Sequence, residues 1–193
     1  MSIRSQILRG AADAFGQRGF GATSVQHILK EARVSRRTFY RLFRNKKDVL
    51  HEIFETAGMM LIQAIRQAAT LGRTPQENLE NCIEVYVRAP KSAGPILQVL
   101  QAEASRPGSK LAQRREQLIE EIVRVVDEQV RLERNQEIDP LIYRGVLAAM
   151  EAISNYVYTE TAASEQDIER AKQAMVRIFA GSVGEPEANK AAA

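Results

Sequence analysis

The chain has little of what small secreted proteins and membrane proteins depend on. Tryptophan is absent, and Cys82 is the only cysteine among 193 residues. One cysteine excludes a framework of intrachain disulfides and favours a reducing compartment. No apolar run approaches the roughly 20 residues of a membrane-spanning helix, and the amphipathic, charged N-terminal segment is unlike a secretion signal. We therefore expect a cytoplasmic protein without a membrane span.

The sequence also lacks the signatures of catalysis. It contains no nucleophile elbow, phosphate-binding loop or dinucleotide fingerprint. Its two histidines, His27 and His51, fall in different predicted helices without cysteines or an acidic cluster at ligand spacing. Cys82 lies in an apolar stripe, so we interpret it as a small core residue in preference to a redox-sensing thiol. We therefore predict that the protein is not an enzyme and has neither a cofactor nor a metal.

Glycine and proline are sparse and fall between long stretches with helical periodicity. This pattern predicts an all-α fold of about nine helices. The helix that follows the capping sequence at Thr74 is predicted to end near Val87, because residues 90–95 contain two prolines and a glycine. The small and polar residues 184–193 predict a disordered tail.

The net charge of +3 conceals an uneven distribution. Residues 1–50 hold 11 Lys and Arg against 3 Asp and Glu, whereas residues 51–193 hold 16 against 21. The basic first quarter predicts an anionic partner that binds there. The acidic remainder argues against a protein that coats nucleic acid with its whole surface.

One stretch, residues 34–44, concentrates this positive charge. Phe39, Leu42 and Phe43 have the spacing of a buried helical stripe, and Ser35 stands where an N-cap belongs. The opposite face carries cationic, hydroxyl and aromatic side chains and no acid: Arg36, Arg37, Thr38, Tyr40, Arg41 and Arg44. A solvated surface helix is the ordinary interpretation of such a run. The missing acids and the upstream sequence favour a DNA-recognition helix instead.

The upstream residues predict two further helices, about 2–18 and 23–32, joined to the basic stretch by a short link. Two short helices with so tight a turn, supported by a longer first helix, are typical of a helix-turn-helix. A fourth amphipathic helix of about 24 residues begins near Lys46, after the N-cap residue Asn45. It is longer than a small binding domain needs, so we expect it to continue into a second domain.

Residues 7–50 resemble the DNA-binding domain of the TetR family of transcriptional regulators. The matching positions are Ala12, Phe15, Gly19, Thr23-Ser24-Val25, Ile28, Ala32, Val34-Ser35, Thr38-Phe39-Tyr40, Phe43, Lys46 and Leu50. The resemblance implies three N-terminal helices, a linking fourth helix and a C-terminal ligand-binding domain. It also implies a dimer in which the last two long helices form a four-helix bundle. Effector binding in the C-terminal domain would then shift the linking helix and change the spacing of the two DNA-binding heads.

Carried over by position, the resemblance implies that Ser24 and Tyr40 contact phosphates. Lys46 matches a lysine at the start of the fourth helix, where free amides meet the DNA backbone. Three residues correspond to positions that reach base edges: Arg36, Arg37 and Thr38. The predicted DNA-binding set is completed by Ser35 and Arg41.

This chain departs from the family pattern at four positions. Arg33 stands where glycine is usual between the second and third helices, which predicts an uncommon backbone angle. Arg37 replaces a small residue, Leu29 replaces an alanine and Leu42 replaces a histidine. Base preferences of relatives therefore do not transfer to this chain.

We expect an effector pocket between helices of the C-terminal domain. Its candidates are polar or soft residues that interrupt apolar stripes: Cys82, Tyr86, Glu103, Met150, Asn155 and Tyr156. For each of them, core packing or a surface position is the more ordinary interpretation. The aliphatic helices favour a hydrophobic or amphipathic effector. Residues 141–180, which include Tyr156 and Tyr158, form the expected dimer surface. The alternative is a monomer that buries these residues internally.

Two hypotheses remain open at this stage. The first is a dimeric, ligand-responsive repressor of a palindromic operator, with a DNA-binding domain at 1–47 and a ligand-binding and dimerisation domain at 48–183. The second is a helical small-molecule-binding or adaptor protein whose basic head binds nucleic acid nonspecifically. Only the first predicts protection of a short symmetric DNA sequence.

Overall fold

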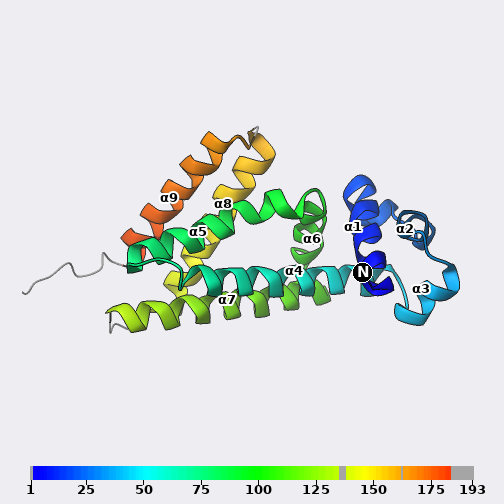
Figure 1. The fold of residues 1–193 in the computed structure, drawn as a ribbon, viewed down its shortest axis with the longest axis horizontal. Helices are drawn as coiled ribbons and strands as arrows, with labels where there is room; N and C mark the ends of the chain where they lie inside the picture. The colour runs from blue at the N-terminus through cyan, green and yellow to red at the C-terminus, as the bar shows by residue number, and fades with distance from the viewer. Residues whose placement is uncertain (1, 135–137, 162, 184–193) are drawn as a thin grey trace, which may run out of the picture. The chain divides into compact units, whose positions relative to one another are not determined.

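The computed structural model describes residues 2–134, 138–161 and 163–183, and in these ranges all regular secondary structure is helical, with nine helices and no strand (Figure 1). The helices are α1 (Ile3–Ala22), α2 (Val25–Ala32), α3 (Arg36–Leu42), α4 (Lys46–Ala68), α5 (Pro75–Ala93), α6 (Ile96–Ala104), α7 (Lys110–Arg134), α8 (Pro140–Glu160) and α9 (Glu165–Val183). The all-α prediction is confirmed. Within the described residues no helix is long and apolar enough to cross a membrane. The predicted tail, 184–193, lies outside them.

The chain forms two compact units, residues 1–60 with 93–117 and residues 61–92 with 118–193. Both α4 and α7 begin in the first unit and end in the second, as expected for the long fourth helix. The units are groups of residues in contact, so the functional boundary between residues 47 and 48 remains a prediction.

The first unit is built around α1, which packs on α2 and α6. Its core contains fully buried aromatic and aliphatic side chains from the first four helices, including Ile7, Phe15, Ile28, Phe39 and Val49. α1 is broken at Gly19, which has a φ of 74°. Glycine adopts this positive φ readily because it has no Cβ that would clash with the backbone. The predicted end of the first helix at this glycine therefore matches the structure.

The second unit contains α8 and α9 packed side by side (Figure 1). Its core joins α5, α7, α8 and α9 through Ile83, Val130, Met150 and Met175. Local capping sets the helix starts as the sequence predicts. Asp139 Oδ1 accepts from the Leu141 amide at 2.8 Å, and Ser164 and Asp167 cap each other's amides.

The predicted end of α5 near Val87 is wrong, because the helix continues through Pro90 to Ala93. Contacts with α9 hold the last turn: Arg88 and Lys91 donate to Glu165 at 2.8 and 2.7 Å. The Val87 carbonyl accepts a hydrogen bond from the Tyr158 hydroxyl at 3.0 Å. Gly94, with a φ of 68°, follows the helix. Tertiary contacts thus outweigh the single hydrogen bond that proline removes.

Glu84 links α5 to α9 in an ion-pair cluster with Arg88 and Lys172, whose Nζ lies 3.1 Å from Glu84 Oε2. The hydrogen bond from Arg88 is the largest cause that lowers the pKa of Glu84 below its usual 4.5. A carboxyl group whose pKa is lower in the folded state stabilises the fold above the unfolded pKa, and this contribution is lost as the pH falls through the folded pKa.

We therefore expect Glu84→Gln to lower the melting temperature at pH 7 and to reduce the acid sensitivity of folding below about pH 4.5. Thermal unfolding followed by circular dichroism from pH 7 to pH 3 measures both effects. Glu121→Gln, an exposed substitution on α7, is the control and should leave the pH profile unchanged. Equal pH profiles for Glu84→Gln and the unsubstituted protein would contradict the assignment.

Candidate DNA-binding face and ligand cavity

The turn between α2 and α3 depends on Arg33, which has φ 50° and ψ 44° in the left-handed region. The Val34 amide donates to the Leu29 carbonyl at 3.2 Å, and the Arg33 amide donates to the Lys30 carbonyl at 3.3 Å. These bonds satisfy carbonyls at the end of α2. The uncommon backbone angle predicted for Arg33 is confirmed. The turn therefore keeps its tight geometry without a glycine.

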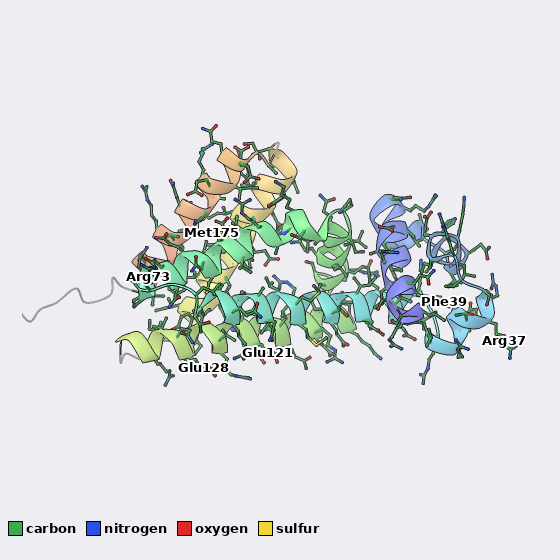
Figure 2. The ribbon with its side chains drawn as sticks, in the orientation of Figure 1. Arg37, Phe39, Arg73, Glu121, Glu128 and Met175 are labelled. Atoms are coloured by element: carbon green, nitrogen blue, oxygen red, sulfur yellow. The ribbon has the colours of Figure 1, made fainter. Side chains whose placement is uncertain are left out.

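α3 begins after Ser35, whose hydroxyl accepts from the Thr38 amide at 3.1 Å. Phe39 is fully buried, and Figure 2 shows it directed into the first unit while Arg37 extends away from it. The helix ends at Leu42, so Phe43 is extended rather than helical, although it is buried as predicted. The aromatic contact of Phe39 with Phe43, at 5.8 Å between ring centroids, helps to hold this short helix in place.

The outer face of α3 is cationic and free of carboxylates. Arg36, Arg37 and Arg41 are exposed, and Tyr40 is 49% exposed. In the described part of the chain, none of these arginines forms an ion pair, although other exposed arginines of the protein do. Unpaired guanidinium groups beside hydroxyl and aromatic side chains can neutralise phosphates and donate to base edges.

Gln26 on α2 contributes to this face, a role that the sequence analysis missed. Its Oε1 accepts from Arg36 Nη2 at 3.1 Å, which orients one of the two arginines predicted to reach bases. Arg37 has no such partner among the described residues. The sequence alone gives little indication of this role, because an exposed glutamine on a short helix is common. Only the turn between α2 and α3 brings Gln26 beside Arg36.

Ser24 is the N-cap of α2, where its hydroxyl accepts from the His27 amide at 3.3 Å and its own amide donates to His27 Nδ1 at 3.2 Å. This reciprocal pair gives His27 a structural role. Among the described residues, no group of three His, Cys, Asp or Glu side chains could hold a metal ion. The Ser24 side chain is exposed, and its phosphate contact remains a prediction.

Lys46 has a role that its position in the sequence did not suggest. Its Nζ donates to the carbonyls of Phe20, Gly21 and Thr23 at 2.7, 3.2 and 2.6 Å. The same ammonium lies 4.5 Å from the Phe20 ring centroid. All three donors of the lysine are therefore used inside the protein, where they join the start of α4 to the end of α1. A contact of Lys46 with DNA remains a prediction.

We expect Lys46→Met to reduce the free energy of unfolding by about 2 kcal/mol, because charge-assisted bonds to carbonyls are lost. The matched control is Lys47→Met, which removes an exposed neighbouring charge without these contacts. Urea unfolding of both variants measures the difference. If Lys47→Met were the more destabilising substitution, the structural role of Lys46 would be wrong.

The second unit contains a cavity of about 90 Å³ between α4, α5, α7, α8 and α9. Its lining is almost entirely aliphatic and aromatic, with no ionisable carboxylate, amine, guanidinium or imidazole. The lining residues are Ile65, Ala69, Pro75, Asn78, Leu79, Cys82, Ile83, Tyr86, Ile122, Val123, Val125, Val126, Gln129, Val130, Tyr143, Val146, Leu147, Met150 and Phe179.

The structure brings three of the six predicted pocket residues together at this cavity: Cys82, Tyr86 and Met150. Glu103 lies on α6 in the first unit, where Arg106 pairs with it. Asn155 and Tyr156 are exposed on α8 and do not line the cavity. Whether any of the six binds a ligand remains a prediction.

Comparisons with known proteins agree with this geometry. Residues 7–53 match the family model described as bacterial regulatory proteins of the tetR family. An uncharacterized HTH-type transcriptional regulator of Bacillus subtilis, YhgD, is 29% identical over 110 residues, which are 54% of this chain. The match spans about half of the relative, 56% of its length.

Solved structures share the fold across nearly the whole chain. The regulator FadR of Bacillus subtilis, in complex with stearoyl-CoA, superposes with a TM-score of 0.78 at 17% identity, covering 92% of this chain and 98% of that one. The fatty acid degradation regulator FadR of Bacillus halodurans superposes with a TM-score of 0.75 at 20% identity, covering 89% and 97%. The N-terminal helix-turn-helix is thus similar to that of the tetR family of bacterial regulatory proteins, and the solved structures share the fold of the helices that follow it.

Proposed function

We propose that the protein is a ligand-responsive transcriptional repressor that binds a palindromic operator as a homodimer. The observation that carries this proposal is the outer face of α3, with its exposed arginines free of carboxylate partners in the described part of the chain. A face of this kind can enter a major groove, with arginine suited to guanine and the threonine methyl to thymine. Arg36, Arg37 and Thr38 are the proposed base-reading residues.

The remaining predicted contacts surround this helix. Ser24 and Tyr40 are proposed to contact phosphates, and Arg41 adds charge to the same face. For Lys46 we propose a supporting role through its three carbonyl contacts, rather than a side-chain contact with DNA. Because several phosphates are neutralised per head, operator affinity should fall steeply with salt concentration.

Dimerisation through α8 and α9 is supported by an exposed stripe on α8. Leu141 and Tyr156 are 72% and 62% exposed, and the positions between them at helical spacing include exposed Gly145, Ala148 and Ala152. Small side chains let two helices approach closely, and large exposed apolar side chains favour burial by a partner. Tyr158, by contrast, is used within its own unit by the bond to Val87.

The proposed effector is a hydrophobic or amphipathic small molecule that binds in the cavity and releases the repressor from DNA. α4 supplies Val49 and Leu50 to the core around the helix-turn-helix and Ile65 to the cavity wall. A ligand that displaces Ile65 therefore acts on the helix that also anchors the DNA-binding head. The stearoyl-CoA complex of the B. subtilis regulator FadR supports an amphipathic ligand for this fold.

Footprinting on the DNA that flanks the gene tests the proposal. We expect protection of one short symmetric sequence, and a dimer in solution by sedimentation at the same protein concentration. Uniform weak protection without a symmetric site would instead support the adaptor hypothesis, in which the basic head binds nucleic acid nonspecifically.

A further inference from the structure

We infer that the cavity selects an uncharged, mostly hydrocarbon molecule that carries one hydrogen-bonding group, and that Gln129 binds this group. The inference rests on the proposed function for its biological meaning, but it concerns the chemistry of the cavity alone. It identifies the class of ligand and one specificity-determining residue.

The lining of the cavity carries no charged side chain. No ionisable acid or base with an ordinary pKa near neutrality faces the cavity, and aliphatic residues from α5, α7 and α8 form most of its wall. A charged group would lose its hydration there without gaining a counter-ion. A carboxylate, phosphate or ammonium group of a ligand is therefore excluded from the cavity, whereas hydrocarbon surface is favoured.

Most polar residues that line the cavity already have partners within the protein. Asn78 Oδ1 accepts from the Gly72 amide at 2.7 Å, and the Tyr143 hydroxyl donates to Asp127 Oδ1 at 3.3 Å. Cys82 Sγ is directed to the Ile65 carbonyl at 3.6 Å. Tyr86 also has a partner within the protein. Four of the five polar lining residues are thus already engaged.

Gln129 is the exception. Gln129 is half-buried and lines the cavity, and its carboxamide forms no hydrogen bond with a described residue. It lies on the face of α7 that also presents Ile122, Val125 and Val126, at the spacing where an aliphatic side chain would complete the stripe. An amide offers one acceptor and two donors, so it can bind a hydroxyl or a carbonyl group equally well.

The size of the cavity limits the part of the ligand that it encloses. At about 90 Å³ it is smaller than the roughly 150 Å³ apolar cavity that accepts benzene. Met150 lines the wall, and its flexible side chain allows the cavity to adapt to a slightly larger group. The end of an aliphatic chain with one small polar group matches this space, and a ring with one such substituent requires the Met150 side chain to move.

Three probes of similar shape test the inference: p-cresol, toluene and p-toluate. Cys82 provides the readout, because it is the only cysteine of the chain and lies on the cavity wall. A bound probe should slow its reaction with a maleimide, and the concentration dependence gives the affinity. We expect p-cresol to bind most tightly, toluene more weakly and p-toluate at least tenfold more weakly than p-cresol.

The decisive variant is Gln129→Leu, which keeps the size of the side chain and removes its amide. It should weaken p-cresol binding about fivefold to tenfold and leave toluene binding equal or tighter, because the wall becomes fully apolar. Gln113→Leu, an exposed substitution on the same helix, is the matched control and should change neither affinity. Thermal unfolding of each variant confirms that it is folded before the probes are compared.

Each outcome separates this inference from the proposed function. If p-toluate bound as tightly as p-cresol, or if Gln129→Leu left the preference for p-cresol unchanged, the inference would be overturned, whatever the protein does with DNA. If the Gln129-dependent preference were observed but p-cresol left operator binding unaffected, the inference would stand and release by this class of ligand would fail.

Discussion

Replacing both Arg36 and Arg37 by alanine is expected to remove most of the operator specificity while the fold remains intact. Each lost base contact should cost on the order of 1–3 kcal/mol, so the pair should weaken operator binding by at least about 30-fold. The reason is geometric as well as electrostatic. Arg37 is unpaired in the described part of the chain and extends from α3 (Figure 2), and Arg36 is oriented by Gln26.

Fluorescence anisotropy with an operator duplex and a scrambled duplex measures this loss at several salt concentrations. A lost base contact changes operator affinity but leaves the scrambled duplex almost unaffected, whereas a lost phosphate contact weakens both and lowers the salt slope by about one. The matched control is Arg73→Ala with Arg124→Ala, which removes two exposed arginines outside the helix-turn-helix. Full operator affinity in the Arg36 and Arg37 variant would show that α3 is not the recognition helix.

Adding a single methyl group at Gly10 is expected to be among the most destabilising small substitutions in the protein. A Cβ at this position would lie 2.5 Å from the Ala32 amide nitrogen, 2.7 Å from its Cα and 2.8 Å from its Cβ. Two of these atoms are backbone, so no rotamer change relieves the overlap. α1 and α2 would have to move apart, with an expected loss of about 3 kcal/mol, the upper end for overpacking in a core.

Gly10→Ala should therefore lower the urea midpoint of unfolding and weaken operator binding at a fixed temperature, because Ala32 leads directly into the Arg33 turn that positions α3. Gly21→Ala in the same helix is the control, since nothing lies within 4 Å of its added Cβ. Its stability should be equal or slightly higher, because alanine reduces the freedom of the unfolded chain. Similar unfolding midpoints for the two variants would contradict the close approach of α1 to α2.

The helix-turn-helix could be predicted in detail because its determinants are local. The i, i+3, i+4 spacing of apolar residues marks the buried faces, and Ser24, Ser35 and Asn45 accept from amides within three residues of themselves. Even the strained angle at Arg33 follows from the place where a glycine is usual. Each of these features depends on interactions between residues that are close in the sequence, so it can be predicted without knowing the tertiary structure.

The cavity was predicted less completely, since its wall is assembled from segments far apart in the chain. Cys82, Tyr86 and Met150 interrupt apolar stripes and do line it. Gln129 also lines the cavity, but a glutamine in a helix rich in charged residues does not indicate a pocket residue from the sequence. Glu103 showed the same sequence signal as the other candidates, yet α6 packs with α1 in the first unit.

What the sequence determined by itself is the helical class, the start of nearly every helix and the cationic face of α3, because periodicity, capping and charge act over a few residues. The tertiary structure alone decided that Lys46 is held by three carbonyls, that α5 passes through Pro90, and which polar side chains at the cavity already have partners. These outcomes depend on atoms that are distant in the chain and meet only after folding, and there the burial and pairing of a group outweigh its local preference.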